Sequence, residues 1–273
     1  MRLAGFGDGR LGIVEGETLR DVTEWAYANC ARRVEDPLIA FIEAAARGAT
    51  PAGAKLAAAG VRFGPPLRRP GKIVAAAANY LSHTREMNPG VAAPGGVREK
   101  GFFLKAPSSI IGPGEAIRLP FADRRTDYEA ELAVIIGRTA SCIDEAQALA
   151  HVFGYTCLLD ITLRGKEDRG LRKSFDSFTP IGPWVVTRDE IPEPNSLSIA
   201  CRVNGELRQD DSTRSMTLQV PGLIAWISSV MTLEPGDLIA TGTPAGVGPL
   251  RAGDRVEVAI ERLGTLAVTV AAR

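Results

Sequence analysis

The sequence predicts an α+β protein that is mainly β, with a β roll as its larger part and a small α/β domain ahead of it. Short apolar runs of strand length recur along the chain. Many of them follow one another with turn residues but no helix between them, which favours a roll over a doubly wound sheet. The chain has 273 residues, 45% of them hydrophobic, so it is long enough to bury a large core.

The first 70 residues are expected to form the small domain. Strands are predicted at 2–6 and 12–15, followed by a helix near Asp36 and Pro37, which suit its N-cap and first turn. Residues 7–12 match the glycine spacing of a dinucleotide-binding motif, but a strand rather than a helix follows them, so a hairpin turn is the better interpretation. A segment rich in proline and glycine at 64–71 then leads into a second domain at 71–273.

The elements of the second domain follow from apolar runs and turn signals. Strands are predicted at 73–78, 102–105, 132–136, 153–159, 184–187, 237–241 and 255–270. A helix is expected near 144–152 with Asp144 as its cap, and a second one behind Pro221, where apolar residues repeat at helical spacing. Asn204 and Gly205 predict a tight hairpin, residues 180–183 a turn, and the glycine- and proline-rich stretch at 88–96 a mobile lid.

The charge balance indicates a small-molecule partner. Lys and Arg together number 32, as do Asp and Glu, so no basic excess points to nucleic acid or to a membrane surface. No window approaches 18 uninterrupted apolar residues, and the N-terminus turns polar too early for a signal peptide. The four cysteines are far apart and are expected to be reduced thiols. We therefore expect a cytoplasmic protein.

Two glutamates, Glu129 and Glu131, stand two residues apart just before an apolar run. On a strand their side chains face the same side, roughly 6 to 7 Å apart, either as the solvated face of an edge strand or as half of a metal site. Asp160 favours the metal site, because it ends another apolar strand, where an unpaired charge is costly to bury. Oxygen ligands alone suit Mg²⁺ or Mn²⁺ better than zinc. Asp127 remains a rival ligand or an outer group.

The chain has only two histidines, which limits the choice of a general base. His83 lies three residues before Glu86, so one helical turn would bring imidazole and carboxylate together and raise the basicity of the ring. A solvated surface pair is the alternative. His151 falls in the last turn of a predicted helix, where a structural role is expected. Lys173 lies in a polar loop, where a lysine is usually solvated.

Six segments resemble the fumarylacetoacetate hydrolase family, in its acylpyruvate hydrolase-like and 2-hydroxyhepta-2,4-diene-1,7-dioate isomerase-like branch. They occur in the family's order within 72–270 and read NYLSHTRE (79–86), FLKAPSS (103–109), DYEAELA (127–133), GYTCLLD (154–160), KSFD (173–176) and TGTPAGVG (241–248). The resemblance implies a β-roll catalytic domain, a homodimer and a Mg²⁺ or Mn²⁺ cofactor. It also implies a set of site residues: Glu129, Glu131 and Asp160 as metal ligands, His83 and Glu86 as a water-activating pair, Lys173 as a stabiliser of the substrate enolate, and Arg164, Gly242 and Thr243 as substrate contacts.

By this resemblance we expect a metal-dependent hydrolase that cleaves a carbon–carbon bond in acylpyruvate-like 2,4-dioxo acids. A decarboxylase or an isomerase or tautomerase of 2-oxo acids would use the same site, and a noncatalytic binder of oxo acids is a third alternative. The chain departs from the family at two places. Glu167 stands where relatives often have glutamine, which puts the acyl group in doubt, and an all-alanine run at 75–78 would enlarge the pocket.

Overall fold

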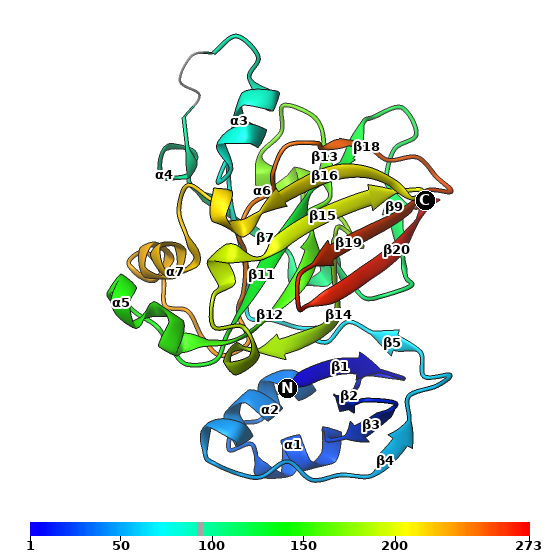
Figure 1. Ribbon diagram of the computed structural model, residues 1–273, viewed down its shortest axis with the longest axis vertical. Coiled ribbons are helices and arrows are strands. Elements are labelled where there is room, and N and C mark those ends of the chain that lie inside the picture. Colours follow the sequence, from blue (N-terminus) through cyan, green and yellow to red (C-terminus); the bar gives the residue numbers. More distant parts are fainter. Residues whose placement is uncertain (92–94) are drawn as a thin grey trace.

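The computed structural model describes residues 1–91 and 95–273, and sheets dominate its architecture, as predicted (Figure 1). Within the described residues, the largest sheet has 12 strands, and the path through ten of them is β4-β3-β2-β1-β14-β12-β11-β17-β6-β7. A five-stranded sheet in the order β16-β15-β19-β20-β9 faces it, and apolar side chains of both sheets share one core. These two sheets form the roll.

The strands of the largest sheet are β1 (Arg2–Phe6), β2 (Arg10–Glu15), β3 (Thr18–Asp21), β4 (Lys55–Ala57), β5 (Phe63–Gly64), β6 (Ile73–Ala76), β7 (Phe102–Lys105), β8 (Ile110–Ile111), β11 (Ala130–Ile136), β12 (Val152–Leu159), β14 (Thr179–Thr187) and β17 (Leu238–Ala240). The five-stranded sheet contains β9 (Ala116–Leu119), β15 (Ser198–Val203), β16 (Glu206–Ser212), β19 (Arg255–Ile260) and β20 (Gly264–Ala272). A small third sheet joins β13 (Thr162–Leu163), β10 (Thr126–Tyr128) and β18 (Gly248–Pro249).

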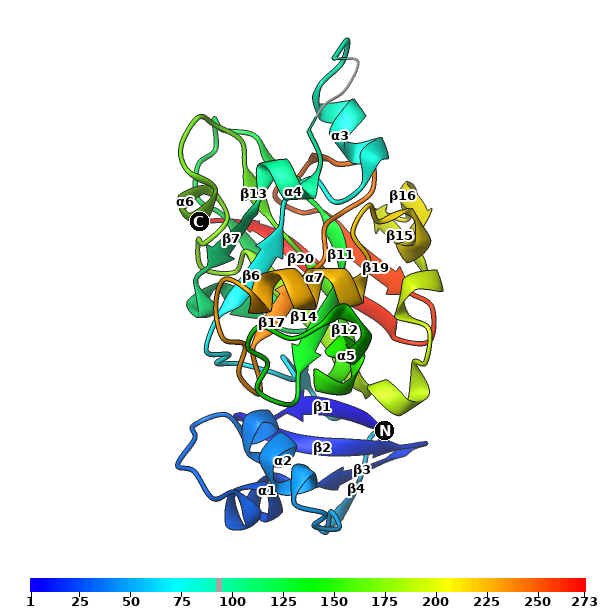
Figure 2. The same ribbon diagram turned by 90° about the vertical axis from the view of Figure 1, so that its left-hand side faces the viewer.

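The helices are short and lie around the sheets. They are α1 (Thr23–Asn29), α2 (Pro37–Ala46), α3 (Leu81–Met87), α4 (Val97–Lys100), α5 (Glu145–Ala148), α6 (Arg169–Arg172) and α7 (Val220–Ser228). Single 3₁₀ turns are η1 (Pro107–Ser109), η2 (Leu149–His151), η3 (Arg188–Glu190), η4 (Pro194–Ser196) and η5 (Thr213–Ser215). Figure 2 shows α7 and α5 on the roll, α1 and α2 on the N-terminal strands, and α3 at the far end of the molecule. None of the described helices is long and apolar enough to cross a membrane.

Strand β11 is buried on both faces, and its side chains alternate between two cores. Leu132, Val134 and Ile136 face the core between the two sheets, while Ala133 and Ile135 face the core shared with α2. This period of two is the geometry of a pleated strand. The odd-numbered face, which also carries Glu131, therefore points away from the five-stranded sheet.

Two predicted hairpin turns and one predicted strand are confirmed. The glycine-rich segment after β1 is a hairpin turn, with Phe6 paired to Arg10, and not a nucleotide-binding loop. The Asn204–Gly205 turn joins β15 to β16, and both residues have positive φ, as a two-residue hairpin requires. Strand β7 has the predicted bounds.

Two local predictions were wrong. The segment expected as a helix at 144–152 is helical, as the four-residue α5 followed by η2, but the predicted cap is wrong because the Asp144 side chain makes no capping hydrogen bond. At the other end of this segment, the carbonyl oxygen of His151 accepts hydrogen bonds from the backbone N–H groups of Gly137 (2.7 Å) and Arg138 (3.2 Å), which connect it to the end of β11. The turn expected at 180–183 lies inside the continuous strand β14, whose pairing with β12 is shifted between Tyr155 and Cys157.

The N-terminal strands continue the largest sheet. Strand β1 pairs antiparallel with β14, where Leu3 lies opposite Val185. The division into domains at 1–70 and 71–273 stays a prediction, and the segment expected to form a lid includes residues 92–94, which lie outside the described residues.

Asp36 connects the start of α2 to residues 68–69 through four backbone hydrogen bonds. One carboxylate oxygen accepts from Leu38 (2.9 Å) and Ile39 (3.3 Å) at the start of α2, and the other from Arg68 (2.7 Å) and Arg69 (3.0 Å). The residue is only 2% exposed. The predicted cap therefore also fixes the segment that leads into the roll.

Replacing Asp36 by alanine should lower the free energy of unfolding by about 2 to 3 kcal/mol, because it removes a cap and leaves buried N–H groups without partners. Urea denaturation followed by circular dichroism measures this change. Asp144→Ala is the matched control at a helix start without a capping bond, and it should cost less than about 0.5 kcal/mol. Equal losses in the two variants would contradict the role of Asp36.

Candidate metal centre and active site

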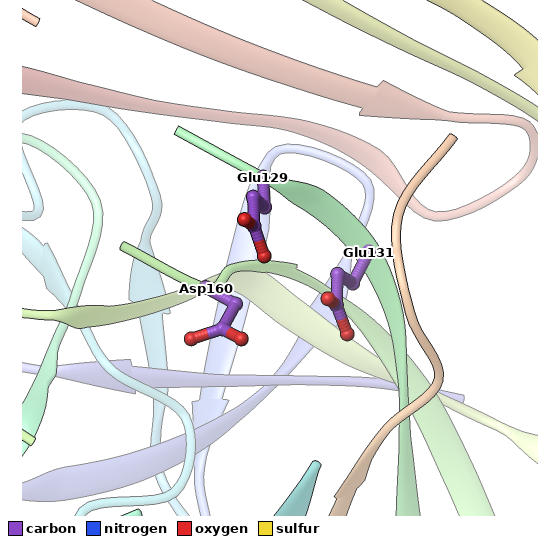
Figure 3. A group of neighbouring side chains, drawn as sticks. All are labelled: Glu129, Glu131 and Asp160. Atoms are coloured by element: carbon purple, nitrogen blue, oxygen red, sulfur yellow. The ribbon is translucent and has the colours of Figure 1, made fainter. Parts of the chain in front are cut away.

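Backbone pairing brings the three predicted carboxylates together. The N–H of Asp160 donates to the carbonyl oxygen of Glu129 (2.8 Å), which extends the β11–β12 ladder by one step beyond the pair Ala130–Leu159. Glu129 and Asp160 are therefore direct neighbours across the two strands, and Glu131 follows two residues along the same face. Figure 3 shows the three side chains converging from these two strand ends.

The cluster fits a hard divalent cation. One oxygen of each carboxylate lies within 4.8 Å of the other two, and Glu129, Glu131 and Asp160 are 5%, 2% and 1% exposed. Two oxygens on opposite sides of a Mg²⁺ ion would be about 4.2 Å apart, so the cluster has the size of such a site. The donor set holds neither sulfur nor imidazole, which suits Mg²⁺ or Mn²⁺.

Two buried lysines face the carboxylates. The ammonium group of Lys173 donates to Glu129 (2.7 Å) and to Asp160 (2.5 Å), and that of Lys105 donates to Asp160 (2.5 Å) and to the carbonyl of Phe178 (2.8 Å). Lys173 directly follows α6 and is only 5% exposed, so it is not the solvated loop lysine that its sequence context suggested. Each carboxylate oxygen has a second lone pair, which leaves room for a metal ligand bond.

The charges around the cluster move two pKa values in opposite directions. Burial would raise the pKa of Glu129, but Lys173 and Arg164 outweigh it and lower this pKa below its usual value. Burial and the negative charge of Asp160 raise the pKa of Glu131 well above its usual value. The Glu131 side chain accepts a hydrogen bond from the backbone N–H of Gly242 (2.7 Å), and no cation is paired with it among the described residues. A bound cation would supply the positively charged partner that the Glu131 carboxylate lacks.

Asp127 lies outside the metal cluster. Its carboxylate accepts two hydrogen bonds from Arg125, at 2.7 and 2.9 Å, and one from Nε of Arg164 at 2.7 Å. Nη2 of the same guanidinium group donates a hydrogen bond to the Glu129 carboxylate (2.9 Å). Asp127 is thus an outer group that orients Arg164, one of the two possibilities left open by the sequence.

The histidine–glutamate pair forms on α3. Nδ1 of His83 lies 3.4 Å from a carboxylate oxygen of Glu86, and the two side chains are 13% and 34% exposed. The other oxygen of Glu86 accepts from the backbone N–H of Gly246 (3.0 Å), which ties α3 to the loop after β17. Because Nδ1 faces the carboxylate, Nε2 is the nitrogen left to accept a proton.

A cavity of about 270 Å³ joins these groups. Predicted site residues that line it are His83, Glu129, Glu131, Asp160, Arg164, Lys173 and Thr243. The Glu86 carboxylate lies beside Nδ1 of His83, and Gly242 donates its N–H to Glu131. The alanines at 76–78 form part of the wall, as their small size suggested. Glu167 is exposed and pairs with Arg124 (2.8 Å). This residue, which departs from the family pattern, is therefore not part of the cavity wall.

Sequence reasoning missed several contributors. Lys105 ends the apolar strand β7, and a buried charge at a strand end is the same signal that identified Asp160. Gln209 is fully buried and holds Thr243, since its Nε2 donates to the threonine hydroxyl (2.8 Å) while its Oε1 accepts from Ala130 (3.0 Å). Nothing in the pattern of β16 marks this glutamine as inward-facing. Three further cations in the wall were also not predicted, namely Lys100, Arg169 and Arg172.

Comparison with known proteins identifies the family. Residues 72–271 match the model of the fumarylacetoacetate (FAA) hydrolase C-terminal region. The chain belongs to the fumarylacetoacetate hydrolase family. It is 42% identical to a maleylpyruvate hydrolase of Aquipseudomonas alcaligenes over 99% of both chains. It is also 42% identical to a mitochondrial oxaloacetate tautomerase of Bos taurus, over 76% of this chain and 68% of that protein.

A solved structure covers the whole chain. The crystal structure of maleylpyruvate hydrolase from Sphingobium sp. SYK-6 in complex with a manganese(II) ion and pyruvate superposes with a TM-score of 0.83 and 39% sequence identity. The superposition covers 100% of this chain and 99% of that one. The fold and the resemblance to the fumarylacetoacetate hydrolase family are thereby confirmed, and the buried acidic cluster agrees with a divalent metal cofactor.

Replacing Glu131 by glutamine should weaken Mn²⁺ binding by at least about 100-fold, because even outer partners of metal ligands typically change affinity by 10- to 100-fold. Titration of the protein with Mn²⁺, followed by electron paramagnetic resonance, measures the free ion. Glu86→Gln is the control, since Glu86 is outside the cluster and its loss should leave the affinity unchanged. Wild-type affinity in Glu131→Gln would show that the metal lies elsewhere.

Lys105→Met should lower the free energy of unfolding of the metal-free protein by about 3 kcal/mol, because it removes one cation from the buried Asp160. Added Mn²⁺ should raise the melting temperature of this variant more than that of the wild type, since the ion supplies the missing positive charge. Lys55→Met, which breaks the exposed pair with Glu15, should have little effect on either quantity. Equal stability of the two variants would argue against a structural role for Lys105.

Proposed function

We propose that the protein is a Mg²⁺- or Mn²⁺-dependent hydrolase that cleaves the C3–C4 bond of 2,4-dioxo acids of the acylpyruvate class. The observation that carries this proposal is the His83–Glu86 pair, whose imidazole faces the same cavity as the carboxylate cluster. Hydrolysis needs a base for water next to a site that stabilises negative charge on the leaving carbon fragment. The similarity to maleylpyruvate hydrolases supports this class of substrate.

Glu129, Glu131 and Asp160 would hold the ion. When bound, the ion would act as a Lewis acid that a 2-oxo carboxylate chelates through two oxygens, which favours negative charge on the 2-oxo oxygen. The ammonium group of Lys173 lies against two of these carboxylates and lines the cavity, so it can donate a hydrogen bond to the same developing charge. Burial disfavours its charged form, but Asp160 and Glu129 outweigh this effect and raise the pKa of Lys173, which keeps it protonated.

His83 would accept a proton from water at Nε2, while Glu86 holds the ring through Nδ1. The water oxygen attacks the C4 carbonyl, the C3–C4 bond breaks, and its electron pair stays with the pyruvate fragment. The proton taken up by His83 then returns to C3 of that fragment. One dioxo acid and one water thus give pyruvate and a carboxylic acid.

Thr243 is suited to bind the carboxylate of the pyruvate end. Its hydroxyl oxygen accepts a hydrogen bond from Gln209, which leaves the hydroxyl hydrogen for a ligand. Arg164 lines the cavity beside Glu129 and would add positive charge there. A substrate contact by Gly242 stays a prediction, as do the homodimer and the cytoplasmic location.

A tautomerase of oxaloacetate-like acids is the second candidate. The 42% identity to a protein of that activity favours it, and proton transfer between carbon and oxygen needs the same base and the same stabilised negative charge. The two candidates differ in whether water is consumed. Decarboxylation would in turn release carbon dioxide from oxaloacetate, so the products distinguish all three reactions.

His83→Ala should slow the release of pyruvate from acetylpyruvate by about 10³-fold while Mn²⁺ binding is unchanged, because the base is lost but the ligands remain. A coupled lactate dehydrogenase assay measures the pyruvate, and EDTA should abolish its formation in the wild type. His151→Ala is the matched control at the other histidine, which does not line the cavity, and should keep full activity. Undiminished hydrolysis by His83→Ala would refute the base. Conversion of oxaloacetate between its keto and enol forms without any hydrolysis would favour the tautomerase.

A further inference from the structure

Tyr128 connects the strand that leads into the carboxylate cluster to the loop after β17. It ends β10, directly before Glu129, and its hydroxyl group donates a hydrogen bond to the backbone carbonyl of Gly246 (2.9 Å). The residue is only 3% exposed and is not part of the cavity wall. Its hydroxyl group therefore serves the loop rather than a ligand.

Gly246 is held by its backbone alone. Its carbonyl oxygen accepts the bond from Tyr128, and its N–H donates to one carboxylate oxygen of Glu86 (3.0 Å). It has a φ of 100°, and a Cβ atom here would collide with the carbonyl oxygen of Arg208, so only glycine fits. Because a glycine has no side chain to pack, the hydrogen bonds on the two sides of its Cα atom orient its peptide groups.

A second glycine makes room for the tyrosine hydroxyl. Tyr128 lies opposite Gly248 in the pairing of β10 with β18. A Cβ atom on Gly248 would lie 3.0 Å from the Tyr128 hydroxyl oxygen, closer than ordinary van der Waals contact. The absence of a side chain at 248 thus lets the phenol lie against the loop and reach the carbonyl of Gly246.

The same loop holds the helix that carries the base. With one oxygen of Glu86 bound to the N–H of Gly246, the other oxygen faces Nδ1 of His83 at 3.4 Å. A second bond, from the N–H of Ala245 to the hydroxyl oxygen of Ser82 (3.4 Å), also joins α3 to the loop. The Glu86 side chain is 34% exposed, so without its loop partner it would have access to several rotamers.

We propose that Tyr128 is a positioning residue for the general base and acts on it through Gly246 and Glu86. Its hydroxyl group fixes the loop, the loop fixes the carboxylate, and the carboxylate keeps the imidazole of His83 in the tautomer with Nδ1 protonated and Nε2 free to accept a proton. The inference rests on the proposed role of His83 and adds to it a residue that lies outside the cavity wall.

Tyr128→Phe tests the inference because it keeps the ring and removes only the hydroxyl group. It should lower kcat for acetylpyruvate by about 5- to 10-fold, the range of one neutral hydrogen bond, and leave KM within about 2-fold. Tyr27→Phe is the matched control, since it also removes a bond to a backbone carbonyl, that of Glu35 (2.8 Å), and should keep full activity. Undiminished kcat in Tyr128→Phe would overturn the inference and leave the hydrolase function standing.

Two further measurements separate this route from others. Mn²⁺ affinity, followed by electron paramagnetic resonance, should be unchanged in Tyr128→Phe, and a loss of affinity parallel to the loss of kcat would place the effect at Glu129 instead. In a Glu86→Ala background, Tyr128→Phe should lower kcat by less than about 2-fold, because residues that act as a unit are not additive. A full additional loss in the double variant would show that Tyr128 does not act through Glu86.

Nuclear magnetic resonance of the imidazole nitrogens needs no turnover. The chain has two histidines, so His151→Ala leaves only the signals of His83. In alkaline solution, where imidazole is neutral, the Mg²⁺-loaded protein should carry its proton on Nδ1, and Tyr128→Phe should increase the fraction with the proton on Nε2. If acetylpyruvate is not hydrolysed, the proposed function fails and this measurement decides the inference. Unchanged tautomer populations in Tyr128→Phe would refute it whatever the activity.

Discussion

The site depends on the burial of three carboxylates at the ends of two paired strands. Glu129, Glu131 and Asp160 are nearly inaccessible, and like charges at such short range are tolerated only when cations compensate them. The surrounding chain meets this need from separate places, with Lys105 at the end of β7 and Lys173 after α6. Glu131 instead accepts a hydrogen bond from a backbone N–H and has no paired cation among the described residues, so a metal ion would supply positive charge there.

The sequence alone could identify the carboxylates because a strand has a fixed period. Glu129 and Glu131 face the same side by spacing, and Asp160 stood out as a charge at the end of an apolar run. The strand order that places Asp160 beside Glu129 is not encoded in any local pattern. The family resemblance implies only that the three residues share a metal site, and the backbone bond between Asp160 and Glu129 shows how the strands bring them together.

The missed residues share a physical cause. Lys105 contacts Asp160 across 55 positions of the sequence, and Gln209 contacts Thr243 across 34, so neither partner can be inferred from periodicity. The helix predicted at 144–152 was shortened for a similar reason, because Val152 pairs with Ile136 across the sheet and begins β12. Local patterns therefore predicted most strands and the two hairpin turns, whereas partners of buried polar groups required the tertiary structure.

The pairing of β1 with β14 affects more than the outline of the sheet. Strand β14 carries Thr179 near its start, one residue after the Phe178 carbonyl that binds Lys105, and its later residues pair with the N-terminal strand. Without β1, this part of β14 would present a row of open backbone donors and acceptors, a surface prone to pairing with other chains. The first few residues thus cover the backbone of a strand whose opposite end lies next to the support of the carboxylate cluster.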